Sequence, residues 1–251
     1  MWGQETWTVL LAGGISAAIA VGVAWFLRKR EFEPEDVTIG FLGPSLAAMF
    51  LLVLALALAT EWQTIGSAQQ AAGNEAVAVR QIYWAASGLP QPAGNELTTQ
   101  VRGYLSTVIH HDWPQMERGT LDDRSDQLLA AMGTFVLRLN TTTSGASNAQ
   151  QYALGQLSVL ASARAQRADA AESRLPLGVL VAVIFTSLIV CVFPFAGGIR
   201  SDKVCIAIAI IQASLVAVAV VVVFQLDNPF TGPLAITPDS FTQIAPLVGA
   251  R

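Results

Sequence analysis

Two hydrophobic patterns follow one another along this chain, and each predicts a different kind of helix. Four long runs contain no Asp, Glu, Lys or Arg: residues 8–27, 39–60, 177–196 and 204–226. A helix rising about 1.5 Å per residue needs about 20 residues to cross roughly 30 Å of hydrocarbon, which is the length of each run. Because an ionised side chain at the bilayer centre costs about 2.5 to 3.5 kcal/mol, the runs predict four transmembrane helices.

Between the second and third runs, apolar residues recur every three or four positions, as on amphipathic helices. The stripes occupy residues 65–86, 97–113, 121–139 and 150–174. They are separated by the breaks SGLPQPAGN, DWPQMERGT and NTTTSGASN, which are rich in the turn-forming residues Gly, Pro, Asn and Ser. No stretch has the two-residue period of a β-strand. The pattern predicts a helical insert into which the second and third transmembrane helices continue.

The expected fold is therefore all-α: a multi-pass membrane protein with four transmembrane helices and a helical extramembrane insert between helices two and three. Its expected parts are a first transmembrane hairpin (1–62), a helical extramembrane domain (63–175), a second transmembrane hairpin (176–226) and a Pro-rich C-terminal tail (227–251). In the tail, Pro229 forbids further ordinary helix. An extended segment should follow and pack against the insert or a neighbouring subunit, the alternative being a position along the lipid headgroups.

Composition supports the membrane class. The chain is 53% hydrophobic and 13% charged, and its net charge of -4 comes with no basic stripe that would suit nucleic acid. The mean hydropathy of +0.51 is too high for a soluble domain of average composition. Cys191 and Cys205 lie in or beside the third and fourth runs, where we expect inert packing thiols.

Positive charges near the ends of the runs predict the orientation. Arg28, Lys29 and Arg30 follow the first run instead of preceding it, so this run is a retained helix and not a secretory signal. Arg200 and Lys203 lie between the third and fourth runs. Because Lys and Arg of short loops stay in the cytoplasm, both termini and the helical domain are expected to be extracytoplasmic, in a bacterial plasma membrane.

Small residues repeat every four positions on the first and fourth predicted transmembrane helices, a spacing that lets helix backbones approach closely. The expected helix-packing residues are Gly14, Ala18, Gly22, Ala209, Ala213 and Ala217. The polar residues inside the runs, such as Gln212, are not ionisable. The spans therefore lack the carboxylates that a proton relay or an ion-coupled carrier usually needs.

The adjacent residues His110, His111 and Asp112 invite a metal-site interpretation. Neighbours on a helix point about 100° apart, however, and the chain contains no other histidine, so we expect no metal site. A helix end capped by Trp113 and Pro114 is the preferred interpretation. The sequence has no Gly-rich phosphate loop, no paired-carboxylate motif and no nucleophile beside a base. Neither an enzyme nor a cofactor is expected.

Charged residues in the insert leave two interpretations open. Glu75 interrupts a small, apolar stretch and is either the interhelical partner of an arginine or part of an ion path. Arg164 and Arg167, close to Asp169 and Glu172, form either a solvated face or a vestibule that attracts anions.

Several blocks resemble a known family. NEAVAVRQIY (74–83), LPQP (89–92), YLSTVIHHDWPQM (104–116), RAQR (164–167) and LDNPFTGPLAITPDSF (226–241) look like recurring blocks of the bestrophin-like domain of bacterial membrane proteins. The resemblance covers nearly the whole chain, and function is unassigned for much of this family. The residues that it marks are Glu75, Trp113, Pro114, Arg164, Arg167, Pro229, Phe230 and Pro238.

The resemblance implies an oligomeric membrane pore that passes small anions such as chloride or bicarbonate, because bestrophins proper are pentameric anion channels. Their narrow neck is lined by apolar side chains of the second membrane helix. The corresponding candidates here are Ile39, Phe41, Pro44, Ser45 and Phe50. Bestrophins keep the large helical part in the cytosol, which disagrees with the charge distribution above.

The expected partners are the lipid bilayer, further copies of the chain and small anions. The alternative function is a membrane-anchored sensor or scaffold whose helical extracytoplasmic bundle binds a ligand or a partner protein.

Overall fold

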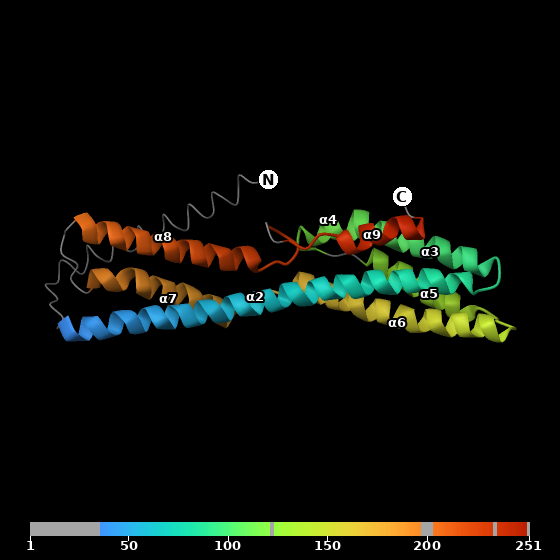
Figure 1. Ribbon diagram of the computed structural model, residues 1–251, viewed down its shortest axis with the longest axis horizontal. Coiled ribbons are helices and arrows are strands. Elements are labelled where there is room, and N and C mark those ends of the chain that lie inside the picture. The colour runs from blue at the N-terminus through green and yellow to red at the C-terminus, as the bar shows by residue number, and fades with distance from the viewer. Residues whose placement is uncertain (1–35, 121–122, 197–202, 233–234, 250–251) are drawn as a thin grey trace. The chain divides into compact units, whose positions relative to one another are not determined.

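The structure is a computed structural model that describes residues 36–120, 123–196, 203–232 and 235–249; side chains are described except in residues 36–41, 195–196 and 203–206. Every regular element in these ranges is a helix, which confirms the all-helical prediction (Figure 1). The helices are α2 (Asp36–Ser87), α3 (Ala93–Thr107), the π-helix η1 (Val108–Asp112), α4 (Trp113–Met116), α5 (Arg124–Arg138), α6 (Ser144–Glu172), α7 (Leu177–Ala196), α8 (Lys203–Leu226) and α9 (Asp239–Val248). The predicted helix 8–27, with Gly14, Ala18 and Gly22, lies outside the described residues.

Three segments of the described chain are long and apolar enough to cross a membrane: Leu42–Ser87, Ser144–Pro194 and Ala207–Leu226. Each contains most or all of one apolar run seen in the sequence. Large apolar side chains are exposed on all three, for example Leu52 on α2, which is 68% exposed, Phe185 on α7 and Leu215 on α8. Exposed apolar surface on this scale fits contact with lipid. The chain is a membrane protein.

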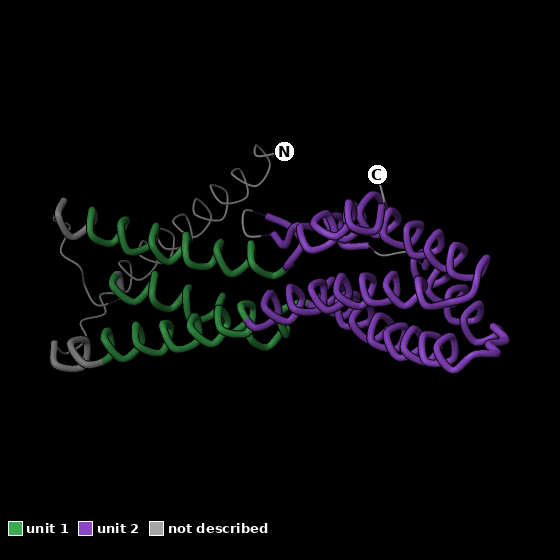
Figure 2. Tube along the Cα trace, turned by 45° about the vertical axis from the view of Figure 1, so that its right-hand side comes forward, with its two compact units in different colours: residues 1–62, 174–227 green, residues 63–173, 228–251 purple. Residues whose placement is uncertain are grey.

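The chain divides into two compact units (Figure 2). The first unit comprises Met1–Trp62 and Arg174–Asp227. Its described helices pack through two small apolar clusters, one around Phe50, Val190, Cys191 and Val216, the other around Ala57, Leu175, Val183 and Val223. The Leu175 backbone N–H donates to Asp227 Oδ1 at 2.6 Å, so a side chain just after α8 binds the chain just before α7.

One of the two predicted transmembrane helices that border the insert continues into it without a break, and the other does not. α2 runs unbroken from Asp36 to Ser87, as predicted for the second transmembrane helix. The same prediction is wrong for the third, because α6 ends at Glu172 and α7 begins at Leu177. Pro176 explains the break: it disfavours helical dihedrals at the residue before it and suits the start of the next helix.

The second unit comprises Gln63–Ser173 and Asn228–Arg251. Its hydrophobic core is built from the second half of α2 and from α3, α5 and α6, with α9 added from the tail. α3 packs against α5 and α9, and α5 packs against α6. Thr143 caps α6 by accepting the Ala146 N–H, and Gln150 donates to the carbonyls of Val136 and Leu139 at the end of α5. These bonds close the turn between the two helices.

The tail packs against the helical insert, as expected, but it is not extended throughout. Residues Asp239–Val248 form α9, which begins after Pro238 and ends at Gly249 in a left-handed conformation. Its buried residues Phe241, Ile244 and Val248 are spaced three and four apart, the period of an amphipathic helix. Arg102 Nε on α3 donates to the Val248 carbonyl at 2.6 Å and so satisfies a helix end that would otherwise lack a partner.

Candidate functional site

Four charged residues lie in the core of the second unit, each no more than 1% exposed: Glu75 on α2, Asp112 on η1, and Arg164 and Arg167 on α6. Three separate stretches of the sequence therefore supply charge to one buried place. Removing a charge from water costs several kcal/mol unless partners satisfy it, so the geometry of the pairs decides whether the core is stable.

Glu75 and Arg167 form a bidentate ion pair. Arg167 Nε donates to Glu75 Oε2 at 2.7 Å and Nη2 donates to Oε1 at 3.0 Å. The Tyr104 hydroxyl on α3 donates to Glu75 Oε1 at 2.6 Å. Burial raises the pKa of Tyr104 well above its ordinary value, and the Glu75 carboxylate raises it further, so Tyr104 remains a donor. Of the two interpretations of Glu75, the interhelical partner of an arginine is confirmed.

Arg164 joins η1 and α5 to α6. Its Nη1 donates to Asp112 Oδ2 at 2.5 Å, while Nε and Nη2 donate to the two carboxylate oxygens of Asp126 at 2.6 and 3.1 Å. Asp112 Oδ2 also lies 3.5 Å from Arg167 Nη2. Acidic side chains of three elements thus neutralise the two arginines.

Both interpretations of Arg164 and Arg167 from the sequence were wrong. The arginines neither form a solvated face nor line an open vestibule, because both are buried and paired. Their expected neighbours Asp169 and Glu172 are exposed. On α6, residues three apart point inward together while the adjacent acids point outward, so the true partners are distant in sequence.

A π-helix sets the direction of Asp112. η1 inserts a wider turn between α3 and α4, and the helical path continues through Trp113 and Pro114 to Met116. The predicted helix end at Trp113 and Pro114 is therefore wrong. Proline cannot donate to the carbonyl four residues earlier, and a wider turn ahead of it removes the need for that bond. Within η1, Asp112 is buried, while His111 is half-buried and His110 is exposed.

Aromatic rings cover the buried arginine. The Arg167 guanidinium carbon lies 5.3 Å from the centre of the Trp113 ring and 5.8 Å from that of Phe241. Trp113 meets the rings of Phe230 and Phe241 edge-on, with centroids 5.7 and 5.5 Å apart. Its indole N–H donates to the Ile236 carbonyl at 3.1 Å. Aromatic faces attract a guanidinium, so the tail completes the surroundings of Arg167.

The prolines of the tail shape this contact. Asn228 Oδ1 accepts the Phe230 backbone N–H at 2.9 Å, and the Ile236 N–H donates to the Pro229 carbonyl at 2.9 Å. Pro238 stands at the start of α9. All eight residues marked by the family resemblance thus lie in the second unit, and direct contacts join four of them in the order Glu75, Arg167, Trp113 and Phe230.

Sequence reasoning missed three members of this cluster: Tyr104, Asp126 and Phe241. The sequence contained a clue to each of them. Tyr104 and Phe241 lie within the blocks that resemble the bestrophin-like family. Arg164 and Arg167 are three residues apart on α6, so they share one helix face and, if that face is buried, need acidic partners from other elements. The sequence alone does not say which of the nearby acids point inward.

The candidate residues of the first unit have different surroundings. Pro44 and Ser45 are exposed on α2, whereas Phe50 is 5% exposed and packs with Val190 and Val216. The side chains of Ile39 and Phe41 lie outside those described. Ala209 is buried, Ala213 and Ala217 are half-buried, and Ala213 packs against the Phe50 cluster. Cys191 is a buried free thiol, and the side chain of Cys205 is not among those described.

The buried network has a structural role: its ion pairs and hydrogen bonds connect several helices of the second unit. Glu75, Asp112 and the two arginines are engaged with one another and shielded from solvent, whereas the Asp126 side chain that binds Arg164 is 57% exposed. Among the described residues, no group of three or more His, Cys, Asp or Glu side chains could hold a metal ion. The cluster fixes how α2, η1, α5 and α6 face one another.

Comparison with known proteins gives a consistent result. No curated protein matches the chain. Solved structures of a bacterial bestrophin homologue from Klebsiella pneumoniae match it over nearly its full length. One variant has 13% identity, a TM-score of 0.68, and coverage of 98% of this chain and 99% of that chain. A second variant has 14% identity, a TM-score of 0.68 and coverage of 97% of both chains. At such identities the likeness concerns the fold.

A family model described as the bestrophin-like domain matches residues 9–241, which include most of both units, the buried ion pairs and the tail residues that contact Trp113. This match, together with the full-length likeness in fold, shows that the chain belongs to the bestrophin-like family.

Proposed function

We propose that the protein forms an oligomeric membrane pore that conducts small anions such as chloride or bicarbonate. The observation that carries the proposal is the family match over residues 9–241, since bestrophins proper are anion channels. The uncharged apolar runs within α2, α7 and α8 are compatible with it, because a narrow apolar constriction can control ion flow by dewetting and needs no charged ring.

An exposed apolar strip on the second unit supports self-association. Val77 and Trp84 are seven residues apart on α2, and Tyr152 and Val159 are seven apart on α6; all four are exposed. The Tyr152 hydroxyl donates to Gln81 Oε1 at 2.6 Å, so the two helix faces adjoin. Exposed Trp and Tyr side chains of this kind are typical of protein interfaces. Another copy of the chain is the occupant that an oligomeric pore requires.

We propose that α2 lines the pore. Pro44 and Ser45 are exposed, as a lining would require, and Ile39 and Phe41 precede them on the same helix. Phe50 is packed within its own subunit, so we assign it a supporting position behind the lining.

The main test is anion flux. Purified protein reconstituted in liposomes should conduct chloride or bicarbonate above the level of protein-free vesicles. Flux equal to that of empty vesicles would refute the pore. The sensor or scaffold alternative would instead be favoured by a second membrane protein that co-purifies in a fixed ratio.

A cysteine variant tests the lining directly. Ser45→Cys, exposed on α2, should react with a charged thiol reagent and lose most of its flux, whereas Phe50→Cys, buried, should be protected. Each is made with Cys191 and Cys205 replaced by Ala. Reaction at both positions with unchanged flux would remove α2 from the lining.

Topology is proposed from the positive charges of the loops: both termini and the helical domain lie outside the cytoplasm. A reporter enzyme fused after Asn95 distinguishes the two orientations. Activity of a periplasm-dependent reporter is expected. Activity of a cytoplasm-dependent one would reverse the assignment.

A further inference from the structure

One side of the second unit presents a strip of residues of the kinds found at the centres of protein interfaces. Val77, Arg80 and Trp84 are three and four residues apart on α2, so they share one helix face. Tyr152 and Val159 extend the strip on α6, where the Tyr152 hydroxyl donates to a side chain of α2. The apolar run within α2 ends at residue 60, well before Val77, so contact with lipid does not account for these five residues, here called the α2–α6 strip.

Arg80 presents a guanidinium group that needs an acceptor. Its Nε is buried and donates to no partner in the described part of the chain. The guanidinium carbon lies 5.1 Å from the centre of the Trp84 ring, and Trp84 is 54% exposed. Because the aromatic ring already orients the guanidinium, less entropy is lost when it binds a carboxylate. The α2–α6 strip therefore suits a partner that brings both an apolar surface and a carboxylate.

One face of α5 offers both. Asp126, Ala130 and Leu137 are exposed, and their spacing of four and seven residues places them on one side of the helix. Leu137 is 68% exposed. The Asp126 side chain is 57% exposed although it binds the buried Arg164. Since a carboxylate has about four acceptor positions, Asp126 can accept from a second arginine as well. These three residues are here called the α5 face.

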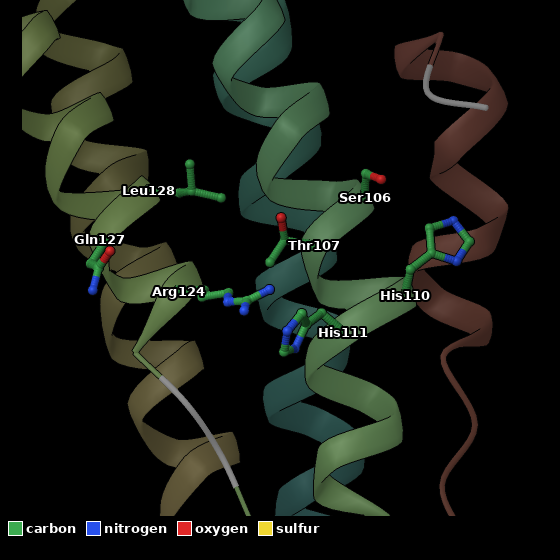
Figure 3. A pocket seen from close by; sticks show the side chains of 7 residues that line it. All are labelled: Ser106, Thr107, His110, His111, Arg124, Gln127 and Leu128. Atoms are coloured by element: carbon green, nitrogen blue, oxygen red, sulfur yellow. The ribbon is translucent and has the colours of Figure 1, made fainter.

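The α5 face is distinct from the side of α5 that is turned toward α3. In Figure 3, Arg124 and Leu128 extend from α5 toward η1 and the end of α3, where they contribute to the lining of a pocket of ≈500 Å³. Asp126 instead reaches Arg164 on α6. The α2–α6 strip and the α5 face thus lie on two sides of α6.

The two surfaces match in direction and spacing. α2 and α5 run toward the same end of the second unit in Figure 1. Arg80 and Trp84 are four residues apart on α2, as are Asp126 and Ala130 on α5. We propose that the α2–α6 strip of one copy of the chain binds the α5 face of a second copy. In this contact Arg80 pairs with Asp126, and Trp84 packs against Ala130 and Leu137.

Such a contact is head-to-tail, because two different surfaces of the same chain meet in it. Contacts of this kind can close into a ring, which a pore through several subunits requires. The contact rests on the proposed oligomer and specifies which surfaces of its subunits meet.

Photo-crosslinking of the full-length protein in detergent tests this contact. Trp84→p-benzoylphenylalanine keeps a large aromatic side chain in the strip, and a mixture of isotope-labelled and unlabelled protein separates bonds between copies from bonds within one copy. The cross-linked peptide is expected to come from α5 of another copy. The control is Leu247→p-benzoylphenylalanine, at an exposed position of α9 outside both surfaces, which should give no bond to α5 of another copy.

The other outcomes separate this contact from the pore. Cross-links from position 84 to α2 or α6 of another copy would show that like surfaces meet, and would overturn the head-to-tail contact. An oligomer that conducts anions but gives no cross-link to α5 would overturn this contact and leave the pore intact. A monomeric protein without anion flux would overturn both.

A charge reversal tests the ion pair. Arg80→Glu places two carboxylates opposite each other, so the protein concentration at which half of the oligomer dissociates should rise by about tenfold or more. Mass photometry of the detergent-solubilised protein on dilution measures this. Arg118→Glu, at an exposed arginine outside both surfaces, is the matched control and should leave dissociation unchanged. An equal effect of the two variants would show a response to net charge only and overturn the pair. The cross-linking experiment retains Arg80 and so does not depend on the folding of this variant.

Discussion

The helices of the first unit meet mainly through side chains that differ little from lipid, although Glu61 is also buried there, whereas those of the second unit meet around four buried charges. The first unit packs Ala57, Val183 and Val223 in one cluster and Phe50 with Val190 in the other. Lipid tails are as apolar as these residues, so close packing, and not escape from water, must hold such helices together.

In the second unit the exclusion of water from an apolar core stabilises the fold, yet this core also contains Glu75, Asp112, Arg164 and Arg167. Buried ion pairs add little net stability compared with apolar residues of equal size, but each member needs its partner. We interpret the pairs as devices that select one arrangement of the helices. The comparison indicates that the helix arrangement of the first unit is set by the fit of apolar side chains. The helix arrangement of the second unit is set by the correct pairing of buried charges.

The largest effect should come from breaking one pair. Arg167→Met leaves Glu75 buried without its guanidinium partner, and we expect the free energy of unfolding to fall by about 3 to 5 kcal/mol. Urea unfolding of the full chain in detergent, followed by tryptophan fluorescence, measures this. Arg138→Met, on the exposed side of α5, is the control and should change stability by less than about 0.5 kcal/mol.

The double variant Glu75→Leu with Arg167→Met sharpens the same test. Replacing both members of a buried pair by apolar residues is often neutral, so most of the lost stability should return. A double variant as unstable as Arg167→Met alone would show that Tyr104 or Asp112, and not the ion pair, carries the effect.

The next effect tests packing by shape in the first unit. Ala57 is fully buried against Val183 and Val223, and Ala57→Leu should destabilise the unit by about 1 to 3 kcal/mol through overpacking. Unfolding in mixed micelles of rising SDS content measures it. Ala59→Leu, exposed on the same helix, should have no effect; a loss equal to that of Ala57→Leu would count against dependence on shape.

A smaller effect concerns the tail. Trp113→Phe keeps a ring beside Arg167 but loses the N–H bond to the Ile236 carbonyl, a loss of about 1 kcal/mol. Hydrogen exchange of α9 should become faster while exchange in α7 and α8 stays the same. Trp84→Phe, at a side chain 54% exposed, is the control. Unchanged exchange in α9 would mean that other contacts hold the tail.

The smallest effect should come from polar groups inside the spans. Gln212 Nε2 on α8 donates to the Val190 carbonyl on α7 at 3.2 Å, and Gln212→Leu should cost only about 0.6 kcal/mol, the average for such bonds in membranes. Ser214→Ala is the matched control, because its hydroxyl donates to the Ile210 carbonyl of its own helix. A loss above 2 kcal/mol, well over the largest of about 1.7 measured for such bonds, would contradict the contrast between the units.

Helices were the predictable part of the fold. The stripe from Ile65 to Ala86 and the apolar run ahead of it both fall within α2, and the third stripe contains α5, because hydrophobic periodicity is local information. α9 was missed because Pro229 dominated the interpretation of the tail, although Phe241, Ile244 and Val248 already had a helical spacing.

The candidate site was predictable only in part. Glu75 was recognised as a charge in an apolar stretch that needs an arginine, and that arginine is 92 residues away at Arg167. Local spacing instead suggested Asp169 as a neighbour of the arginines, because a sequence shows adjacency but not which helix face turns inward. The direction of Asp112 depends on a π-turn, and the hydrophobic pattern around it does not reveal one wider turn.

The π-helix Val108–Asp112 makes the length of this segment as important as its composition. If all five residues stayed but formed an ordinary α-helix, everything beyond them would rotate by roughly 90° relative to α3, because the wider turn takes up one extra residue. Trp113 would then leave Arg167, and Asp112 would leave Arg164. An inserted codon in this segment would therefore put the buried charges out of register with their partners, whereas the loss of one residue would remove the wider turn and keep the following helix nearly in register.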